Sequence, residues 1–127
     1  MSGVLLDTTI VIDLLRGHRP ALDFVRALES IPAASEITRV EVLRGVRSGE
    51  RRLTERLLGT FSWIPLDESV ARRAGDLGRR WRASHRGIST ADLVIAATAI
   101  ERGAALATLN VRNFPMIEGL QPPYDAN

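Results

Sequence analysis

The chain has 127 residues, the usual size of one domain, so we expect residues 1–127 to form a single domain. Apolar residues make up 45% of the chain and charged residues 25%, and the formal net charge is +2. All 17 basic residues are Arg, and the absence of Lys and Cys excludes Walker-type nucleotide binding, Schiff-base catalysis, disulfides and thiolate zinc sites.

The N-terminus has no basic region followed by a long apolar run, and no apolar stretch approaches the ~18 residues of a membrane span. We therefore expect a cytoplasmic protein with no membrane segment. A surface whose only basic side chain is Arg suits a nucleic-acid partner, because the planar guanidinium binds phosphate bidentately. A compositional bias toward Arg explains the same observation equally well.

The first part of the chain alternates apolar and helical patterns. Residues 3–6 predict a short buried strand, and a helix follows over residues 10–16. A second helix is predicted over residues 21–30, after Pro20. A short segment, residues 34–37, then leads into a third helix. This third helix is predicted over residues 38–47, and a fourth over residues 50–59.

The second part continues the alternation. A strand is predicted over residues 61–66, and a helix with one apolar face over residues 67–84. The helix predicted over residues 89–102 is apolar nearly all round, so we expect it to be buried. A last strand covers residues 105–108. Strands that alternate with helices indicate an α/β fold, a three-layer α/β/α sandwich with a mostly parallel central sheet.

Three acidic residues lie where strands or loops turn into helices. Asp7 follows the first strand directly, and Glu41 and Asp92 lie near the starts of helices. Ligands of open parallel sheets bind outside the carboxyl ends of the strands, so we expect the three carboxylates to share one cleft. Carboxylates so close together repel one another unless a divalent cation joins them. The pattern predicts metal-dependent phosphate chemistry.

Polar side chains that could supply further oxygen donors surround these acids: Thr8, Thr9, Thr90, Thr108 and Asn110. Asp13 lies farther along the first helix, and we expect it to have a surface or salt-bridging role.

Each acid also has a purely structural interpretation. Asp7 could cap its helix, and the spacing of Thr38 and Glu41, like that of Ser89 and Asp92, fits a capping box. The alternative function is therefore a metal-free regulatory or binding module on the same fold. A phosphatase with Asp7 as its nucleophile is disfavoured, because such enzymes place a second Asp two residues on and use a Lys.

The ordered set of motifs resembles the PIN-domain ribonucleases, and more narrowly the VapC toxins of bacterial toxin–antitoxin pairs. The motifs are VLLDTTIVIDLL, ITRVEVLRG, GISTADLVIAATA and LATLNVRNF. The resemblance implies a PIN-like domain with a Mg²⁺- or Mn²⁺-dependent endoribonuclease site. In such a site a metal-activated water attacks the RNA phosphodiester in line and leaves 5′-phosphate and 3′-hydroxyl ends.

The resemblance also implies roles for individual residues. Asp7, Glu41 and Asp92 match the family's acids, and Thr8 and Thr9 match hydroxyl positions after the first acid. The last motif supplies Asn110 at the family's fourth polar position and Asn113 where the family often has Asp, which removes a possible ligand for a second metal. The implied partners are RNA, a second copy of the chain in a homodimer, and a VapB-type antitoxin. The resemblance further implies that the antitoxin inserts a C-terminal segment into the active-site groove and forms a higher-order complex with the toxin.

Overall fold

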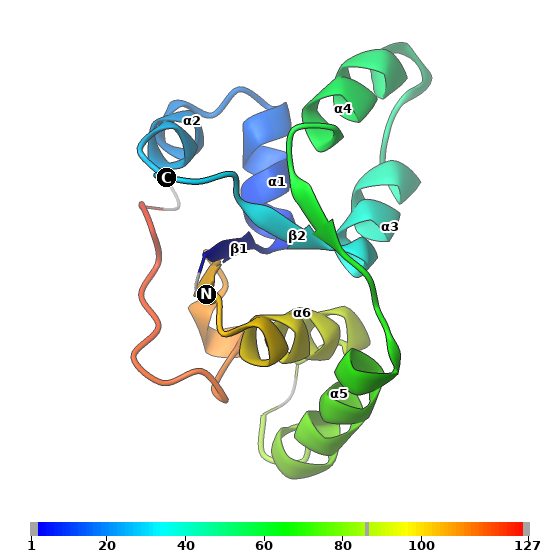
Figure 1. Cartoon of the computed structure of the whole chain (residues 1–127), viewed down its shortest axis with the longest axis vertical. Coiled ribbons are helices and arrows are strands. Elements are labelled where there is room, and N and C mark those ends of the chain that lie inside the picture. Colours follow the sequence, from blue (N-terminus) through cyan, green and yellow to red (C-terminus); the bar gives the residue numbers. More distant parts are fainter. Residues whose placement is uncertain (1–2, 86, 126–127) are drawn as a thin grey trace.

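A computed structural model describes residues 3–85 and 87–125 of the chain. Within these residues, four short parallel strands form one sheet in the order β3-β2-β1-β4 (Figure 1). The strands are β1 (Val4–Leu6), β2 (Ala33–Ser35), β3 (Ser62–Ile64) and β4 (Ala105–Ala107). This sheet confirms the predicted α/β class.

Six α-helices and two 3₁₀ turns connect the strands in the described part of the chain. The helices are α1 (Thr8–Leu15), α2 (Arg19–Arg26), α3 (Glu36–Arg44), α4 (Arg51–Leu58), α5 (Glu68–Trp81) and α6 (Thr90–Arg102). The turns are η1 (Ser48–Glu50) and η2 (Val111–Asn113).

The two faces of the sheet bury different clusters because neighbouring strand residues point to opposite sides. Leu6 and Ala107 pack with residues of α1, α2, α3 and α4 on one face. Leu5 and Leu106 pack with Ile95 and other residues of α6 on the other. Figure 1 shows α1 to α4 on one side of the sheet and α5 and α6 on the opposite side, as a three-layer sandwich requires.

Helix α6 packs directly against the sheet, in the layer that it forms with α5. Its residues from Leu93 to Ala99 are all buried, as its continuous apolar sequence predicts. It packs along α5, whose Val70 and Ala74 are buried against it. Gly103 ends α6 in the left-handed conformation, with φ of 62°, which glycine adopts without steric cost.

Several helix boundaries differ from those predicted, among them the start of α3 and the end of α2. Helix α3 begins at Glu36 instead of residue 38, because the Ser35 side chain accepts a hydrogen bond from the Ile37 amide and caps the helix there. Helix α2 ends at Arg26, earlier than predicted. Arg86, between α5 and α6 in the sequence, lies outside the described residues.

The strand order places the switch point of the sheet between β1 and β4. Strands β2 and β3 follow one another on one side of β1, whereas the chain crosses over to add β4 on the other side. Ligand sites of open parallel sheets form where the strand order reverses, outside the carboxyl ends of the two strands. Residues Asp7 and Thr108 occupy that position, directly after β1 and β4.

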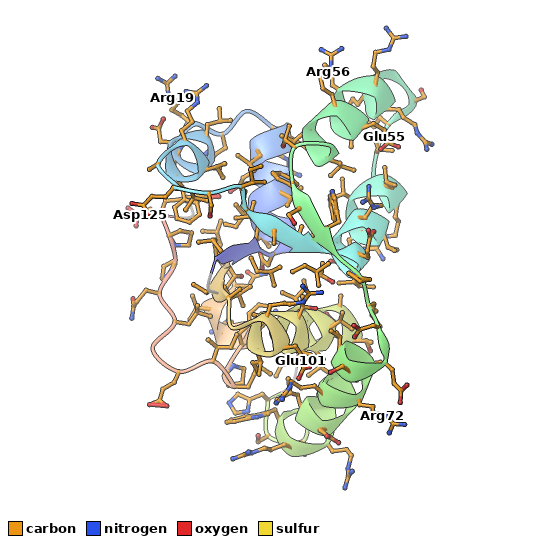
Figure 2. The ribbon with its side chains drawn as sticks, in the orientation of Figure 1. Arg19, Glu55, Arg56, Arg72, Glu101 and Asp125 are labelled. Carbon is orange, nitrogen blue, oxygen red and sulfur yellow. The ribbon has the colours of Figure 1, made fainter. Side chains whose placement is uncertain are left out.

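Many Arg side chains occupy outer helix faces. Figure 2 shows Arg19, Arg56 and Arg72 extending outward from α2, α4 and α5. Arg19 pairs with Asp23 at 3.4 Å and Arg72 with Glu68 at 2.7 Å, each one helical turn away along an exposed surface. Exposed ion pairs of this kind add little to the free energy of unfolding. These Arg side chains therefore belong to solvated helix faces. In residues 3–85 and 87–125, no helix combines the length and apolar composition that crossing a bilayer requires.

Candidate metal-dependent active site

Asp7 is a buried carboxylate at the switch point of the sheet. Its side chain accepts a hydrogen bond from the Ile10 amide at 3.3 Å, so Asp7 caps α1, as its structural interpretation predicted. The Thr9 hydroxyl donates to Asp7 Oδ1 at 2.5 Å, and the Thr108 hydroxyl donates to Asp7 Oδ2. The residue is only 3% exposed. Capping therefore accounts for only part of the bonding at this carboxylate.

Burial also sets the ionisation of this group. Desolvation raises the pKa of the Asp7 carboxyl above its ordinary value of 3.8, although the hydrogen bonds from Thr108, Thr9 and the Ile10 amide oppose the rise. Within the described residues, no Arg or His forms an ion pair with Asp7. A buried carboxylate without a cationic partner is costly in its charged form. The site therefore favours an external cation.

Glu41 reaches the same region from α3. The Thr8 hydroxyl, next to Asp7 in sequence, donates to Glu41 Oε1 at 2.5 Å. The Arg44 guanidinium approaches the other carboxylate oxygen at 4.0 Å. The predicted capping box of Thr38 and Glu41 is wrong: α3 already begins at Glu36, so Glu41 lies inside the helix and caps nothing.

Asp92 lies at the start of α6 and does form the capping box that its spacing predicted. The Ser89 hydroxyl accepts from the Asp92 amide, and the Asp92 carboxylate accepts from the Ser89 amide, both at 3.0 Å. The Asn113 amide nitrogen donates to Asp92 Oδ2 at 3.3 Å. Asn113 therefore stands beside the third acid, in the half-buried segment that follows β4.

The remaining predicted residues are placed less centrally. Asn110 is exposed, and its backbone amide donates to the Thr108 hydroxyl at 2.9 Å while its side chain makes none of the hydrogen bonds found in the described part of the chain. Thr90 is exposed on the first turn of α6 and is not part of this network, again as judged from the described residues. The structure therefore brings Thr8, Thr9 and Thr108 to the acids, but not the side chains of Thr90 and Asn110.

Each of the three acids accepts hydrogen bonds from neutral side chains of its own, and the three do not form one compact group. Thr8 contacts Glu41, Thr9 and Thr108 contact Asp7, and Asn113 contacts Asp92. Across residues 3–85 and 87–125, no set of three or more His, Cys, Asp or Glu side chains stands assembled around a metal position. The available donors are carboxylate, hydroxyl and amide oxygens, and this oxygen-only set fits a hard cation such as Mg²⁺ or Mn²⁺.

Glu41 also borders a groove of about 540 Å³ between α1, α3 and α4. Its lining combines apolar residues such as Ile12 and Leu53 with two basic residues, Arg16 and Arg47. The groove thus begins at one of the acids and continues over a partly apolar, partly charged surface.

Two residues have roles that the sequence analysis did not anticipate. Thr38 is fully buried, and its hydroxyl lies 3.1 Å from the Thr8 hydroxyl, so it contacts a neighbouring helix and does not cap its own. Asp13 is half-buried and accepts a 2.8 Å hydrogen bond from the Tyr124 hydroxyl. Asp13 thus lies at a partly exposed position, as expected, and its hydrogen-bond partner is the neutral Tyr124 of the C-terminal tail.

Comparison with known proteins places this geometry in a family. The PIN domain model matches residues 4–119. The chain is 48% identical over 124 residues to Ribonuclease VapC19 of Mycobacterium tuberculosis, covering 94% of this chain and 98% of that protein. It is 46% identical over 123 residues to Ribonuclease VapC10 of the same organism, covering 95% and 92% respectively. A solved toxin–antitoxin complex from Klebsiella pneumoniae has a chain that superposes with a TM-score of 0.84 at 31% identity, covering 97% of this chain and 99% of that one.

Proposed function

This chain belongs to the PIN-domain family, and we propose that it is the endoribonuclease toxin of a toxin–antitoxin pair, with a Mg²⁺ or Mn²⁺ ion in its active site. The ribonuclease relatives match it over nearly its whole length, which supports RNA cleavage by a single nuclease domain over residues 1–127. Cellular RNA as substrate is consistent with a cytoplasmic location.

One observation carries the metal dependence. The buried Asp7 carboxylate lies at the switch point of the sheet and has no cationic partner among the described residues, and the next residue in sequence, Thr8, donates to a second acid, Glu41. A carboxylate that only capped a helix would not need to be buried with hydroxyl donors on both of its oxygens. We infer that these donors orient Asp7 for a ligand.

The residues that would hold the cation are Asp7, Glu41 and Asp92, with Asn110 as a further candidate. Because no three acidic side chains stand assembled among the described residues, sharing one ion would require these side chains to reorient. When bound, the ion would lower the pKa of a coordinated water and stabilise negative charge on the phosphate oxygens.

The side chains of the chain itself do the remaining work. Thr9 and Thr108 hold the two oxygens of Asp7 in a fixed orientation, and Thr8 does the same for one oxygen of Glu41. Asn113 holds one oxygen of Asp92 and adds no charge beside it. Because the attacking group is water, no side chain of the protein needs to act as nucleophile. Arg side chains beside the cleft would position the RNA backbone.

The partner is a VapB-type antitoxin, as in the toxin–antitoxin complexes that share this fold. We propose that its C-terminal segment occupies the groove that begins at Glu41. The apolar part of the groove suits an apolar side chain, and a basic side chain would neutralise the acids. We also propose that the toxin forms a homodimer and assembles with the antitoxin into a larger complex.

The test is cleavage of total RNA by the purified protein, with cut ends mapped by sequencing. We expect cleavage with Mg²⁺ or Mn²⁺, no cleavage with chelator, and no cleavage by Asp92→Asn. Asp67→Asn is the matched control, because Asp67 caps α5 by accepting from the Val70 amide at 3.0 Å but takes no part in the network of acids. Cleavage that persists in chelator, or in Asp92→Asn, would refute the proposal.

A further inference from the structure

Thr38 is a fully buried residue of α3 whose hydroxyl has one partner among the described residues, the hydroxyl of Thr8. The two oxygens are 3.1 Å apart, and the Thr8 oxygen lies 2.5 Å from Glu41 Oε1. We propose that Thr38 is a positioning residue that holds Glu41 in its working orientation through Thr8. This inference rests on the proposed nuclease function, because it assigns Thr38 to the same site.

The number of hydrogens on each group sets the direction of the two hydrogen bonds, from Thr38 to Thr8 and from Thr8 to Glu41. A hydroxyl carries one hydrogen and can also accept, whereas an ionised carboxylate only accepts. The single hydrogen of Thr8 therefore goes to Glu41, and the hydrogen of Thr38 goes to the Thr8 oxygen. A hydroxyl that accepts one hydrogen bond donates a stronger one, so Thr38 both fixes the rotation of the Thr8 hydroxyl and strengthens its bond to Glu41.

Local structure gives no other reason for a hydroxyl at this position. Ser35 caps α3, so Thr38 is not needed at the helix start. A Val side chain has nearly the same shape and would avoid burying a polar group at a fully buried position. The hydroxyl of Thr38 is thus retained where an apolar side chain would fit, and the group it serves leads directly to an acid of the site.

Glu41 needs such support because a competing group lies nearby. Its side chain is 24% exposed, and the Arg44 guanidinium, on a side chain that is 74% exposed, lies 4.0 Å from its second oxygen. Weakening the Thr8 bond would let the carboxylate turn toward this exposed Arg and toward solvent. Thr38 therefore affects the fraction of molecules in which Glu41 keeps its hydrogen bond to Thr8.

The first test compares Thr38→Val and Thr38→Ser with Thr98→Val. Thr98 is a matched control, because it is also fully buried in a helix but donates its hydroxyl to the Val94 carbonyl of its own helix. On a synthetic RNA that carries a mapped cut site, we expect Thr38→Val to lower kcat by about tenfold with little change in KM. We expect Thr38→Ser to restore most of the rate and Thr98→Val to keep it. The melting temperatures should agree within about 3 °C, because Val replaces Thr without changing its shape.

The second test needs no metal and no RNA. In the metal-free protein, the carboxyl ¹³C resonance of Glu41, identified by its loss in Glu41→Gln, reports its hydrogen bonding. We expect Thr38→Val to shift this resonance, Thr38→Ser to return it, and Thr98→Val to leave it in place. In a Thr8→Val background, Thr38→Val should change neither the resonance nor kcat any further.

The outcomes separate this inference from the proposed function. A wild-type protein that cleaves RNA only with metal, together with a Thr38→Val variant of unchanged kcat or unchanged resonance, would overturn the inference and leave the nuclease proposal standing. A wild-type protein that shows no metal-dependent cleavage would refute the nuclease proposal, and with it the assignment of Thr38 to catalysis.

Discussion

The hydroxyl of Thr108 donates a hydrogen bond to the Asp7 carboxylate across 101 positions of the sequence. The two residues follow β1 and β4, which lie side by side at the switch point of the parallel sheet. The Asp7 amide also donates to the Ala107 carbonyl at 3.0 Å, so backbone and side chain both connect the two strand ends. The position of the first acid is therefore set by the pairing of β1 with β4 in the sheet.

The first prediction concerns the pH dependence of stability without metal. Burial raises the pKa of Asp7 above 3.8, so the folded carboxyl keeps its proton at pH values where the unfolded chain has lost it. The contribution of Asp7 is therefore fully present below pH 3.8 and is lost as the pH rises through the raised pKa. We expect Asp7→Asn to remove this loss and to be more stable than the wild type at neutral pH, as measured by chemical denaturation in chelator.

Adding metal should make the wild type more stable than Asp7→Asn, the reverse of their order in chelator. Mn²⁺ at roughly 100 times its Kd would add about 2.7 kcal/mol to the free energy of unfolding of the wild type. The Asp7→Asn protein, which lacks the charge, should gain much less in the same titration. An equal gain in both proteins would mean that Asp7 does not bind the ion.

Glu41→Ala tests whether this acid serves the site or its helix. Because Glu41 lies inside α3 and Ser35 provides the cap, we expect Glu41→Ala to cost clearly less stability than Ser35→Ala, which should lower the free energy of unfolding by about 1 kcal/mol. Cleavage by Glu41→Ala should fall below roughly one-hundredth of the wild-type rate. A loss of stability as large as that of Ser35→Ala would show that the main role of Glu41 is structural.

Asp92 should show both roles, and two substitutions separate them. Asp92→Ala removes the acceptor for the Ser89 amide, so we expect it to lower the free energy of unfolding by about 1 kcal/mol. Asp92→Asn keeps an acceptor and should stay within about 0.5 kcal/mol of the wild type. Both variants should lose cleavage, because neither has the carboxylate charge. Thermal denaturation and RNA cleavage on the same preparations check this pattern.

Tyr124 and Asp13 join the C-terminal tail to α1, and Figure 1 shows the tail ending beside α2. Tyr124→Phe removes the hydrogen bond, so we expect the free energy of unfolding to fall by about 1 kcal/mol. Asp13→Ala should cost at least as much, because it leaves the half-buried tyrosine hydroxyl without this partner. Both variants should keep most of the RNA cleavage. Their stability effects should not add in the double variant, since both remove the same bond.

Asn113→Asp tests the departure from the family pattern. The Asn113 amide donates to Asp92, so an Asp at this position replaces an attractive contact with repulsion between two carboxylates. We expect a lower melting temperature without metal and a larger rise on adding Mn²⁺ than the wild type shows. A melting temperature that is unchanged in chelator would mean that residue 113 lies outside the influence of the acids.

Local patterns in the sequence determined most of the architecture. The apolar strands around Leu5 and Leu106 and the continuous apolar helix after Asp92 predicted a buried parallel sheet covered by helices, and the structure confirms this class. These features could be predicted because burial follows the periodicity of neighbouring residues and helix starts follow short-range hydrogen bonds. The three acids could be identified for the same reason. Asp7 directly follows a predicted strand, and Glu41 and Asp92 have the sequence spacing of a helix start.

Only the tertiary structure decided what these residues contact. The spacing of Thr38 and Glu41 predicted a cap, but packing of α3 against α1 turns Thr38 toward Thr8 and leaves the cap to Ser35. The contacts of Thr108 with Asp7 and of Tyr124 with Asp13 join residues about a hundred positions apart, and no local pattern encodes them. Such contacts depend on which strands pair and on how helices pack across the sheet, because the free energy that selects them comes from burial of the whole core and not from adjacent residues.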